Sequence, residues 1–541
     1  MEPQEPRPAN LGRSAAVMAV GTTLSRITGL GRLVAAAYAL GVTESRLADT
    51  YNIANTLPNV IYELVLGGVL TSVFIPIVVE ELRTKPREEA WKSVSSLVTT
   101  ALVVLTAITA LSMVAAPAVI RLFTLRIEGG QAAEQQHLAT VFLRMFAPQI
   151  VLYGYAAIAA GLLNAHDRFA VPMFVPILNN LVVIGVFLGF AAVVSGTPTV
   201  ASVDARVGQE LLLALGTTAG VAVMALANWP FLRRLPGRLR FRPRFRDPAV
   251  RKLARLSTWT FGYVLSNQLS FGIALVLAND VQGGPTAYFT AFAFFQLPYG
   301  IAAVSIMTAL MPTLSAQYVD EDDAGFRART AGGIRAMALL MLPATAAYLV
   351  LSRPLIGTLL ENGVMQAESS DLVASVLDTL ALGLLPFSAF LLLLRAFYAR
   401  QDTRTPLFAN MISNTVYTIV SFALFPFLGV PGLGLSHTAC YVVAALLAGR
   451  WLSRAVGGLD GRHTAREIAK SAAAAAVSGV SMLAVVWAVS AATVPGDVRA
   501  AAQLVVGGAV GLVMFVLAAR ALRVEDLDLL SRLLPRRIRL S

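Results

Sequence analysis

The segment SVSSLVTTALVVLTAITALSMVAA, residues 93–116, carries no charged side chain from end to end. A helix of this length crosses a hydrocarbon layer of roughly 30 Å, so the segment predicts a transmembrane helix. The sequence as a whole predicts an all-α polytopic membrane protein with about fourteen transmembrane helices. The other apolar runs lie near residues 14–40, 47–79, 138–163, 170–195, 209–232, 253–279, 286–315, 333–352, 372–399, 406–428, 432–452, 466–491 and 500–521.

The composition of the 541-residue chain excludes an ordinary soluble protein. Hydrophobic residues make up 56% of the chain and charged residues only 14%, whereas soluble proteins carry about 25% charged residues. A net charge of +12 would favour nucleic-acid binding in a soluble protein. Membrane topology explains this charge here, so no nucleic-acid partner is expected. The single cysteine, Cys440, excludes an internal disulfide and a cysteine-based zinc site.

Lysine and arginine cluster in alternate loops, as in membrane proteins whose cytoplasmic loops are the more positive. This alternation predicts that the N- and C-termini are both cytoplasmic. The densest stretch, residues 233–255, is predicted to be a cytoplasmic loop that sets the topology, with contact to anionic lipid as a second role. Basic side chains inside spans usually face a polar cavity or a partner, and four occur here: Arg26, Arg32, Arg144 and Arg395.

Short matches in the same order and at nearly constant spacing indicate an internal repeat. They are Leu24-Ser25 with Leu265-Ser266, Leu57-Pro58 with Leu297-Pro298, and Asn180 with Asn414. Six spans per copy give two parallel lobes, an arrangement that places a substrate site between the halves. The predicted organisation is a cytoplasmic tail (1–13), an N-lobe (14–232), a basic cytoplasmic loop (233–252), a C-lobe (253–452), two additional spans (453–521) and a basic cytoplasmic tail (522–541).

The second span carries a polar stripe at steps of three and four residues, which places its members on one helix face. The stripe consists of Asn52, Asn55, Asn59, Glu63, Gly67 and Thr71. Amides and carboxylates are costly against hydrocarbon, so the stripe predicts the wall of an aqueous cavity. Asn59 and Glu63 are predicted to contact the substrate there. The alternative is interhelical hydrogen bonding.

Arginines in the first span point to an anionic substrate. Arg26 lies near mid-depth and Arg32 one and a half turns later, and the planar fork of a guanidinium matches phosphate oxygens. The alternative is an ion pair with Glu63 or Asp49. Arg395 is a further substrate-contact candidate, although it is close enough to the cytoplasmic end of its span to reach the interface. Arg144 is interpreted as structural.

Asparagines in later spans form a candidate cation site. The amide oxygens of Asn267, Asn410 and Asn414 can ligate a hard ion such as Na⁺, although no carboxylate accompanies them. His437 is isolated and is expected to pack against its neighbours. Motifs of zinc proteases, P-loop NTPases and serine hydrolases are missing from the sequence, so an enzyme is not expected.

Five stretches resemble one known family. They are LSRITGLGRLVAAAYALG (24–41), ADTYNIANTLPN (48–59), GLLNAHDRFAVPMFVPILNN (161–180), QLPYGIAAVSIMTALMPTLS (296–315) and RAFYARQDTRTP (395–406). Together they resemble the MurJ/MviN family of lipid II flippases, within the superfamily that includes the MATE drug exporters. The resemblance extends over about residues 14–525.

The resemblance implies a fourteen-helix fold in which the two additional spans form a lipid-tail groove. It implies transport of lipid II to the outer leaflet of the bacterial cell membrane during peptidoglycan synthesis. We expect no cofactor, and the sequence leaves open whether transport is coupled to Na⁺, to H⁺ or to the membrane potential. Lipid II, membrane lipids and cell-wall synthesis proteins are the implied partners. Arg26 and Arg32 match the family's cavity arginines, and Asp49 and Asn59 its polar positions.

The chain departs from the family pattern at Leu33, at Tyr62 and Glu63, and at Ala293, where many members carry charged residues. Fewer positive charges place more of the substrate contact on Arg26 and Arg32. Other functions compatible with the sequence are export of another polyprenyl-linked saccharide or of drugs, a membrane-embedded glycosyltransferase, and a non-transporting scaffold for cell-wall enzymes.

Overall fold

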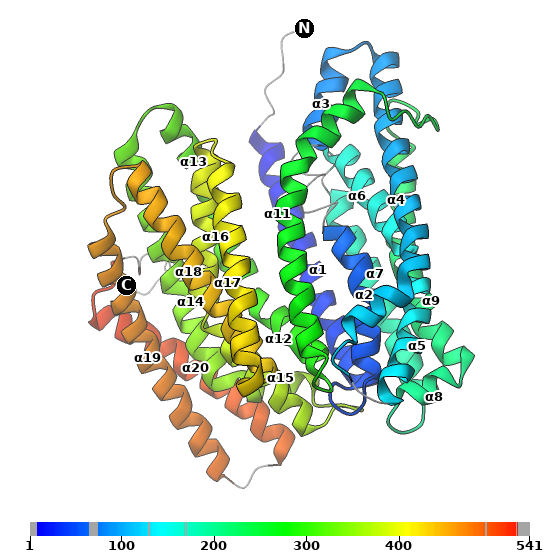
Figure 1. Cartoon of the computed structure of the whole chain (residues 1–541). Helices are drawn as coiled ribbons and strands as arrows, with labels where there is room; N and C mark the ends of the chain where they lie inside the picture. The colour runs from blue at the N-terminus through cyan, green and yellow to red at the C-terminus, as the bar shows by residue number, and fades with distance from the viewer. Residues whose placement is uncertain are drawn as a thin grey trace. The chain divides into compact units, whose positions relative to one another are not determined.

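The computed structural model describes residues 8–63, 74–127, 130–166, 168, 170–492, 495–525 and 527. Gly67 and Thr71 of the predicted stripe lie outside these residues, as does most of the predicted C-terminal tail. The chain forms two compact units. Unit 1 comprises residues 1–285 and 362–365, and unit 2 comprises residues 286–361 and 366–541. The described part of both units is built from helices (Figure 1).

Unit 1 contains the helices of the first seven predicted spans. Long, largely apolar runs become helices that pack against one another, α1 against α7, α7 against α9 and α2 against α5. The helices are α1 (Pro8–Leu40), α2 (Leu47–Glu63), α3 (Ile75–Thr84), α4 (Arg87–Phe123), α5 (Gly130–Phe146), α6 (Gln149–Asn164), α7 (Ala170–Val193), α8 (Val200–Asp204), α9 (Val207–Leu226), α10 (Trp229–Leu232) and α11 (Pro248–Ala278).

Unit 2 contains the remaining helices. The last two, α19 and α20, pack against each other, and both pack against α14. A π-helical segment, Tyr299–Ala303, follows Pro298 and continues directly into the next helix. The helices are α12 (Gly284–Pro298), α13 (Val304–Val319), α14 (Asp323–Leu360), α15 (Ala367–Ala381), α16 (Leu384–Ala399), α17 (Arg404–Leu428), α18 (Val430–Ala455), α19 (Gly461–Ala491) and α20 (Gly496–Ala521).

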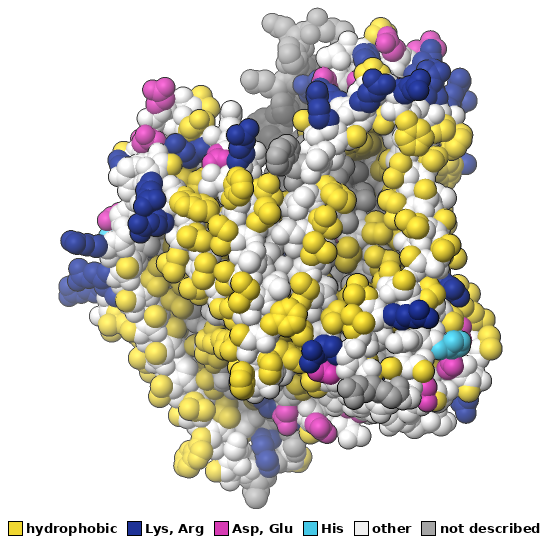
Figure 2. All heavy atoms as spheres, viewed as in Figure 1, with side chains coloured by type: hydrophobic (Ala, Val, Ile, Leu, Met, Phe, Trp, Pro, Cys, Tyr) yellow, Lys and Arg dark blue, Asp and Glu magenta, His cyan; other side chains and the backbone are white. Residues whose placement is uncertain are grey.

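The prediction of an all-α polytopic membrane protein is confirmed. Within the described residues, 11 helices or continuous helix pairs are long and apolar enough to cross a membrane, and the pair α15 and α16, bent by 48°, raises the number to 12. The two predicted spans whose described part does not meet this criterion are 14–40 and 47–79, where the structure has α1 and α2. Hydrophobic side chains cover the visible surface of the long helices, while lysine and arginine gather toward helix ends (Figure 2).

Within the sequence RQDTRTP, residues 400–403 form the turn between α16 and α17, with Gln401 at a φ of 60°, and residues 404–406 begin α17. Asp402 caps the start of α17. One of its carboxylate oxygens accepts bonds from the amides of Arg404 and Thr405, both 3.0 Å long, and the other accepts the Thr405 hydroxyl at 2.6 Å. A carboxylate in this position satisfies amides that have no partner within the helix. The turn therefore begins α17 at a defined residue.

We expect Asp402 to make stability depend on pH. Burial raises the pKa of Asp402, but bonds from Thr405 and Arg404 and the charge of Arg400 outweigh burial and lower the pKa below its ordinary 3.8. The stabilisation is therefore complete above pH of about 4 and is lost as the pH falls through the lowered pKa. Thermal unfolding of purified protein measured against pH should show a smaller acid-induced loss in Asp402→Asn than in wild type.

The matched control is Asp460→Asn, because Asp460 precedes α19 without any side-chain capping bond. This control should retain the wild-type pH dependence. Equal pH profiles for wild type and Asp402→Asn would contradict the assignment.

Candidate functional site

The middle of α1 presents Arg26, which is exposed, and Arg32, which is half-buried. Asn180 on α7 fixes this part of α1, because its Nδ2 donates to the Thr28 hydroxyl at 3.0 Å and to the Ser25 carbonyl at 3.2 Å. Ser25 and Thr28 flank Arg26 in the sequence. The repeat residue Asn180 therefore ties α7 to the part of α1 that carries Arg26.

Glycines on α1 allow α7 to approach closely. A Cβ added at Gly21 would lie 2.9 Å from the Met173 Cβ, and one at Gly29 would lie 3.7 Å from the Asn180 Nδ2. A larger residue at Gly21 would push the helices apart, because real Cβ atoms are not found so close to a neighbour. The small residues of α1 thus serve helix packing, as is common in membrane bundles.

Arg32 lies within electrostatic range of two buried phenols, Tyr51 on α2 and Tyr153 on α6. The Tyr51 hydroxyl is 2.7 Å from the Thr217 hydroxyl. The Tyr51 ring makes edge contacts with three phenylalanines, at centroid distances of 6.3, 5.4 and 5.5 Å, namely Phe142, Phe146 and Phe187. These ring contacts pack α2 against α5 and α7 within unit 1.

Neither arginine forms an ion pair within the part of the chain that the structure describes. The alternative interpretation, an ion pair with Glu63 or Asp49, is therefore not realised in this conformation. A permanently charged guanidinium without an acidic partner is available to bind an anion. Substrate contact by Arg26 and Arg32 stays a prediction, and this geometry is compatible with it.

The residues of the polar stripe on α2 differ in how deeply they are buried. Asn55 is buried, its side-chain oxygen without a hydrogen bond, and its carbonyl accepts the Asn59 Nδ2 at 2.8 Å. Asn52 and Asn59 are half-buried, and Glu63 is exposed at the end of α2. Substrate contact by Asn59 and Glu63 stays a prediction.

Asp49 occupies a buried position on the same helix. Its side chain is 0% exposed, and its Oδ2 accepts the backbone amide of Gly283 at 2.7 Å. Gly283 has a φ of 81° and approaches the Val42 carbonyl so closely that an added Cβ would lie 2.8 Å from it. Asp49 therefore joins α2 to the segment that follows α11, and its contact with substrate stays a prediction.

Further hydrogen bonds hold the segment after α11 against the start of α2. Arg46 donates to the Asn279 carbonyl at 3.0 Å, and the buried Asn279 side chain donates to the Phe123 carbonyl at 3.0 Å. Gln282 donates to the Thr43 carbonyl at 2.7 Å. Sequence reasoning missed these residues because their polar character is ordinary for loops.

The other predicted site residues lie on helices of both units. Asn267 is half-buried on α11 of unit 1, whereas on α17 of unit 2 Asn410 is buried and Asn414 is half-buried. Arg395 is exposed on α16. The proposed cation site and the role of Arg395 stay predictions.

His437 packs as expected. Its ring lies among aromatic side chains, 4.7 Å from the Tyr441 ring, 5.1 Å from Phe295 and 5.7 Å from both Phe292 and Phe387, measured between centroids. The cluster joins α12, α16 and α18 in the core of unit 2. This histidine therefore serves as a packing residue.

A family model described as "Lipid II flippase MurJ" matches residues 36–502 of the chain. The chain belongs to this family. A probable lipid II flippase MurJ of Haemophilus influenzae is 26% identical over 481 residues, which cover 86% of this chain and 90% of the relative. A lipid II flippase MurJ of Burkholderia cenocepacia is 28% identical and covers 79% of this chain and 81% of its own.

Solved structures show the same fold. An inward closed conformation of lipid II flippase MurJ matches with a TM-score of 0.74 at 21% identity, covering 94% of this chain and all of the solved one. An outward-facing MATE family multidrug transporter matches with a TM-score of 0.57 at 15% identity, covering 83% and 96%. The chain is thus a multi-pass membrane protein of a transporter family with the MurJ and MATE architecture.

One residue of this MurJ family member escaped the sequence analysis. Asp378 is a half-buried carboxylate on α15, within the apolar run 372–399, and its side chain lies near that of Ser352 on α14. Its Oδ1 is buried without a hydrogen-bond partner. A lone acidic residue inside a span is unusual, and this is the signal that could have found it.

Proposed function

We propose that this protein moves lipid II from the cytoplasmic to the outer leaflet of the bacterial cell membrane by alternating access. Membership of the lipid II flippase MurJ family supports the substrate. The observation that carries the proposal is the pair of arginines on α1, Arg26 and Arg32, both without an acidic partner in the described residues. A lipid-linked pyrophosphate supplies the anionic oxygens that two guanidinium forks bind.

The protein must lower the free-energy barrier to moving such a headgroup through hydrocarbon. An isolated charge in an apolar medium costs many kcal/mol, so an unassisted pyrophosphate stays in its leaflet. Arginines in a polar path replace the lost hydration, and the polyprenyl chain can remain in lipid. Only binding and release are needed, and no covalent bond changes.

Coupling to an ion gradient or to the membrane potential belongs to the same proposal. The potential supplies about 2.3 kcal/mol per elementary charge per 100 mV. Asn267, Asn410 and Asn414 would supply amide oxygens if Na⁺ is the coupling ion. The proposal also places the N- and C-termini in the cytoplasm and includes contact with cell-wall synthesis proteins.

The decisive experiment replaces the endogenous flippase of a bacterium with this chain as the sole copy. During depletion of the endogenous protein, the fraction of lipid II in each leaflet is measured by its accessibility to an external enzyme or label. We expect this chain to restore outer-leaflet lipid II and growth. Accumulation of lipid II in the cytoplasmic leaflet, despite correct membrane insertion of the chain, would contradict the proposal.

A further inference from the structure

The basic connection between α10 and α11 is ordered along α4 rather than free in solution. The amides of Arg240 and Arg242 donate to the Ser95 and Thr99 hydroxyls, both at 3.2 Å, and that of Arg244 donates to the Thr100 hydroxyl at 3.0 Å. All three hydroxyl-bearing residues are buried on α4. The amides of residues 240, 242 and 244 thus point to one helix, which is the repeat of an extended chain. A turn follows, in which the Asp247 amide donates to the Arg244 carbonyl at 3.2 Å.

This spacing separates two kinds of side chain. In an extended chain, successive side chains point to opposite sides. The even positions of residues 238–246 are all arginine, and the odd positions are Leu239, Phe241, Pro243 and Phe245. We call residues 238–246 the basic strap. Its extended part, residues 238–244, has a cationic side and an apolar side, and Phe245 and Arg246 lie in the turn that follows.

The apolar side of the basic strap is only partly covered by protein. Leu239 packs against the core of unit 1 around α4 and α6. Phe241 and Phe245 are 79% and 59% exposed. Exposed aromatic rings beside cationic side chains are typical of protein at the membrane–water interface. The basic strap directly precedes α11, whose apolar part crosses the membrane.

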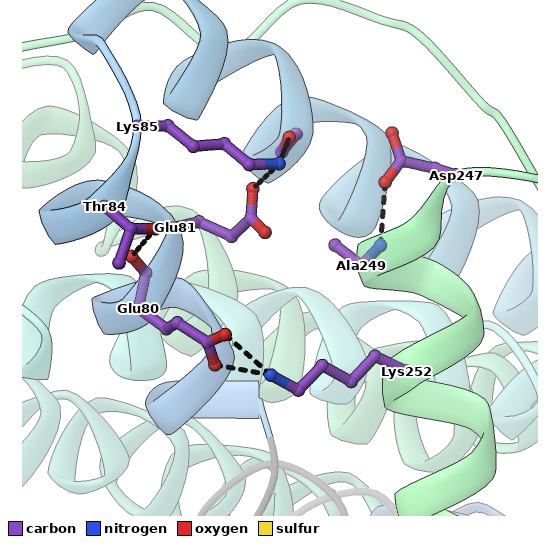
Figure 3. Close-up of polar contacts among 8 residues, drawn as sticks. Glu80, Glu81, Thr84, Lys85, Asp247, Ala249 and Lys252 are labelled. Carbon is purple, nitrogen blue, oxygen red and sulfur yellow. Dashed lines mark hydrogen bonds and ion pairs between the residues drawn. The ribbon is translucent and has the colours of Figure 1, made fainter.

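The cationic side has little acidic compensation. Glu80 pairs with Lys252 at 2.6 Å, Glu81 pairs with Lys85 at 2.8 Å, and Asp247 accepts the Ala249 amide at 3.0 Å (Figure 3). Glu88 pairs with Lys92 at 2.7 Å and also lies within electrostatic range of Arg240. The five arginines of the basic strap form no ion pair in the described residues. Four of them, Arg238, Arg240, Arg244 and Arg246, are exposed.

Figure 2 shows this end of unit 1 as a group of dark blue side chains directly above a yellow surface. A lipid leaflet has a matching arrangement, because its anionic headgroups lie directly beside its hydrocarbon chains. Bonds to the α4 hydroxyls also satisfy amides that would otherwise be costly near the bilayer. These observations are independent of what the protein transports.

We propose that the basic strap is a binding site for the phosphate headgroups of anionic phospholipids. The guanidinium groups bind the phosphate oxygens, and Phe241 and Phe245 lie in the acyl region beneath them. The site goes beyond the transport function, because it faces the surrounding lipid and does not use Arg26 or Arg32.

Native mass spectrometry of the full-length protein tests the proposal, with equimolar phosphatidylglycerol and phosphatidylcholine as the probes. We expect wild type to retain phosphatidylglycerol preferentially. The variant R238Q/R240Q/R244Q/R246Q should lose roughly ten-fold or more of this preference, since each basic residue near an anionic surface contributes about 1 kcal/mol, or about five-fold.

The matched control removes the same charge from exposed arginines of unit 2, in the variant R329Q/R454Q/R462Q/R466Q. This variant should keep the wild-type preference. Equal losses in the two variants would overturn the proposal, because net charge would then explain binding. An unchanged preference in the first variant would also overturn it, as would recognition of a soluble protein by the basic strap without lipid preference.

Two further variants separate geometry from charge. Replacing Ser95, Thr99 and Thr100 with alanine keeps every arginine but removes the anchors, and we expect a weaker phosphatidylglycerol preference. Replacing Phe241 and Phe245 with serine should lower total lipid retention while the headgroup preference remains. Wild-type lipid binding in both variants would contradict an ordered site on α4.

Discussion

Replacing Arg26 or Arg32 with alanine is expected to abolish lipid II transport while the protein still folds and inserts. Each substitution removes a permanent charge that has no acidic partner in the described residues, so folding loses little and anion binding loses much. Truncating one side of a close charged contact commonly costs about 2–5 kcal/mol, so the transport rate should fall on the order of 10²-fold or more. The measurement is lipid II flipping by the purified protein in proteoliposomes.

Two controls define this experiment. Arg121→Ala removes an exposed arginine at the end of α4 and should leave transport unchanged. Arg26→Lys keeps the charge but loses the bidentate fork, so an intermediate rate is expected. If Arg26→Ala and Arg32→Ala both transport at the wild-type rate, these arginines are not the headgroup-binding residues.

Asp49→Ala should strongly destabilise unit 1. The substitution leaves the Gly283 amide without its carboxylate partner in a fully buried position. A hydrogen bond to a charged group contributes about 1.5–3 kcal/mol, and an unsatisfied buried donor adds to the loss. Thermal unfolding of the purified protein should therefore begin several degrees lower, roughly as expected for a loss of that size.

The matched control is Asp280→Ala, because Asp280 lies three residues before Gly283 in the same segment. Asp280 pairs with Arg126 at 2.9 Å, but the two side chains are 33% and 46% exposed. Such exposed pairs contribute about 0–1 kcal/mol, so this variant should unfold close to wild type. Asp49→Asn keeps an acceptor oxygen and should lie between the two. Equal unfolding temperatures for Asp49→Ala and Asp280→Ala would show that the buried bond is unimportant.

Helix placement could be predicted from sequence because a single rule governs it. Residues 93–116 lack charges and lie within α4, and each of the other predicted spans likewise coincides with helix in the described residues. The broken geometry could not be predicted in the same way. Apolar periodicity reports neither the bend between α15 and α16 nor the π-helical segment after Pro298, because both leave the apolar run uninterrupted.

The candidate site shows the same limit. Arg26 and Arg32 were recognised because a guanidinium inside an apolar run is conspicuous. Their lack of an acidic partner became visible only in the structure. Asn180 was recognised as a repeat residue, but its bonds to Ser25 and Thr28 of α1 were not foreseen.

The amino-acid sequence by itself determined that the chain spans a membrane many times, because hydrocarbon accepts only long uncharged helices. It also determined which few side chains are exceptions to that rule. Only the tertiary structure decided their partners. Asp49 meets Gly283 across 234 residues and Asn180 meets Ser25 across 155, and contacts between such distant positions depend on how helices pack. Local sequence patterns do not predict that packing, because it depends on shape and hydrogen bonding between the surfaces of helices that are distant in the sequence.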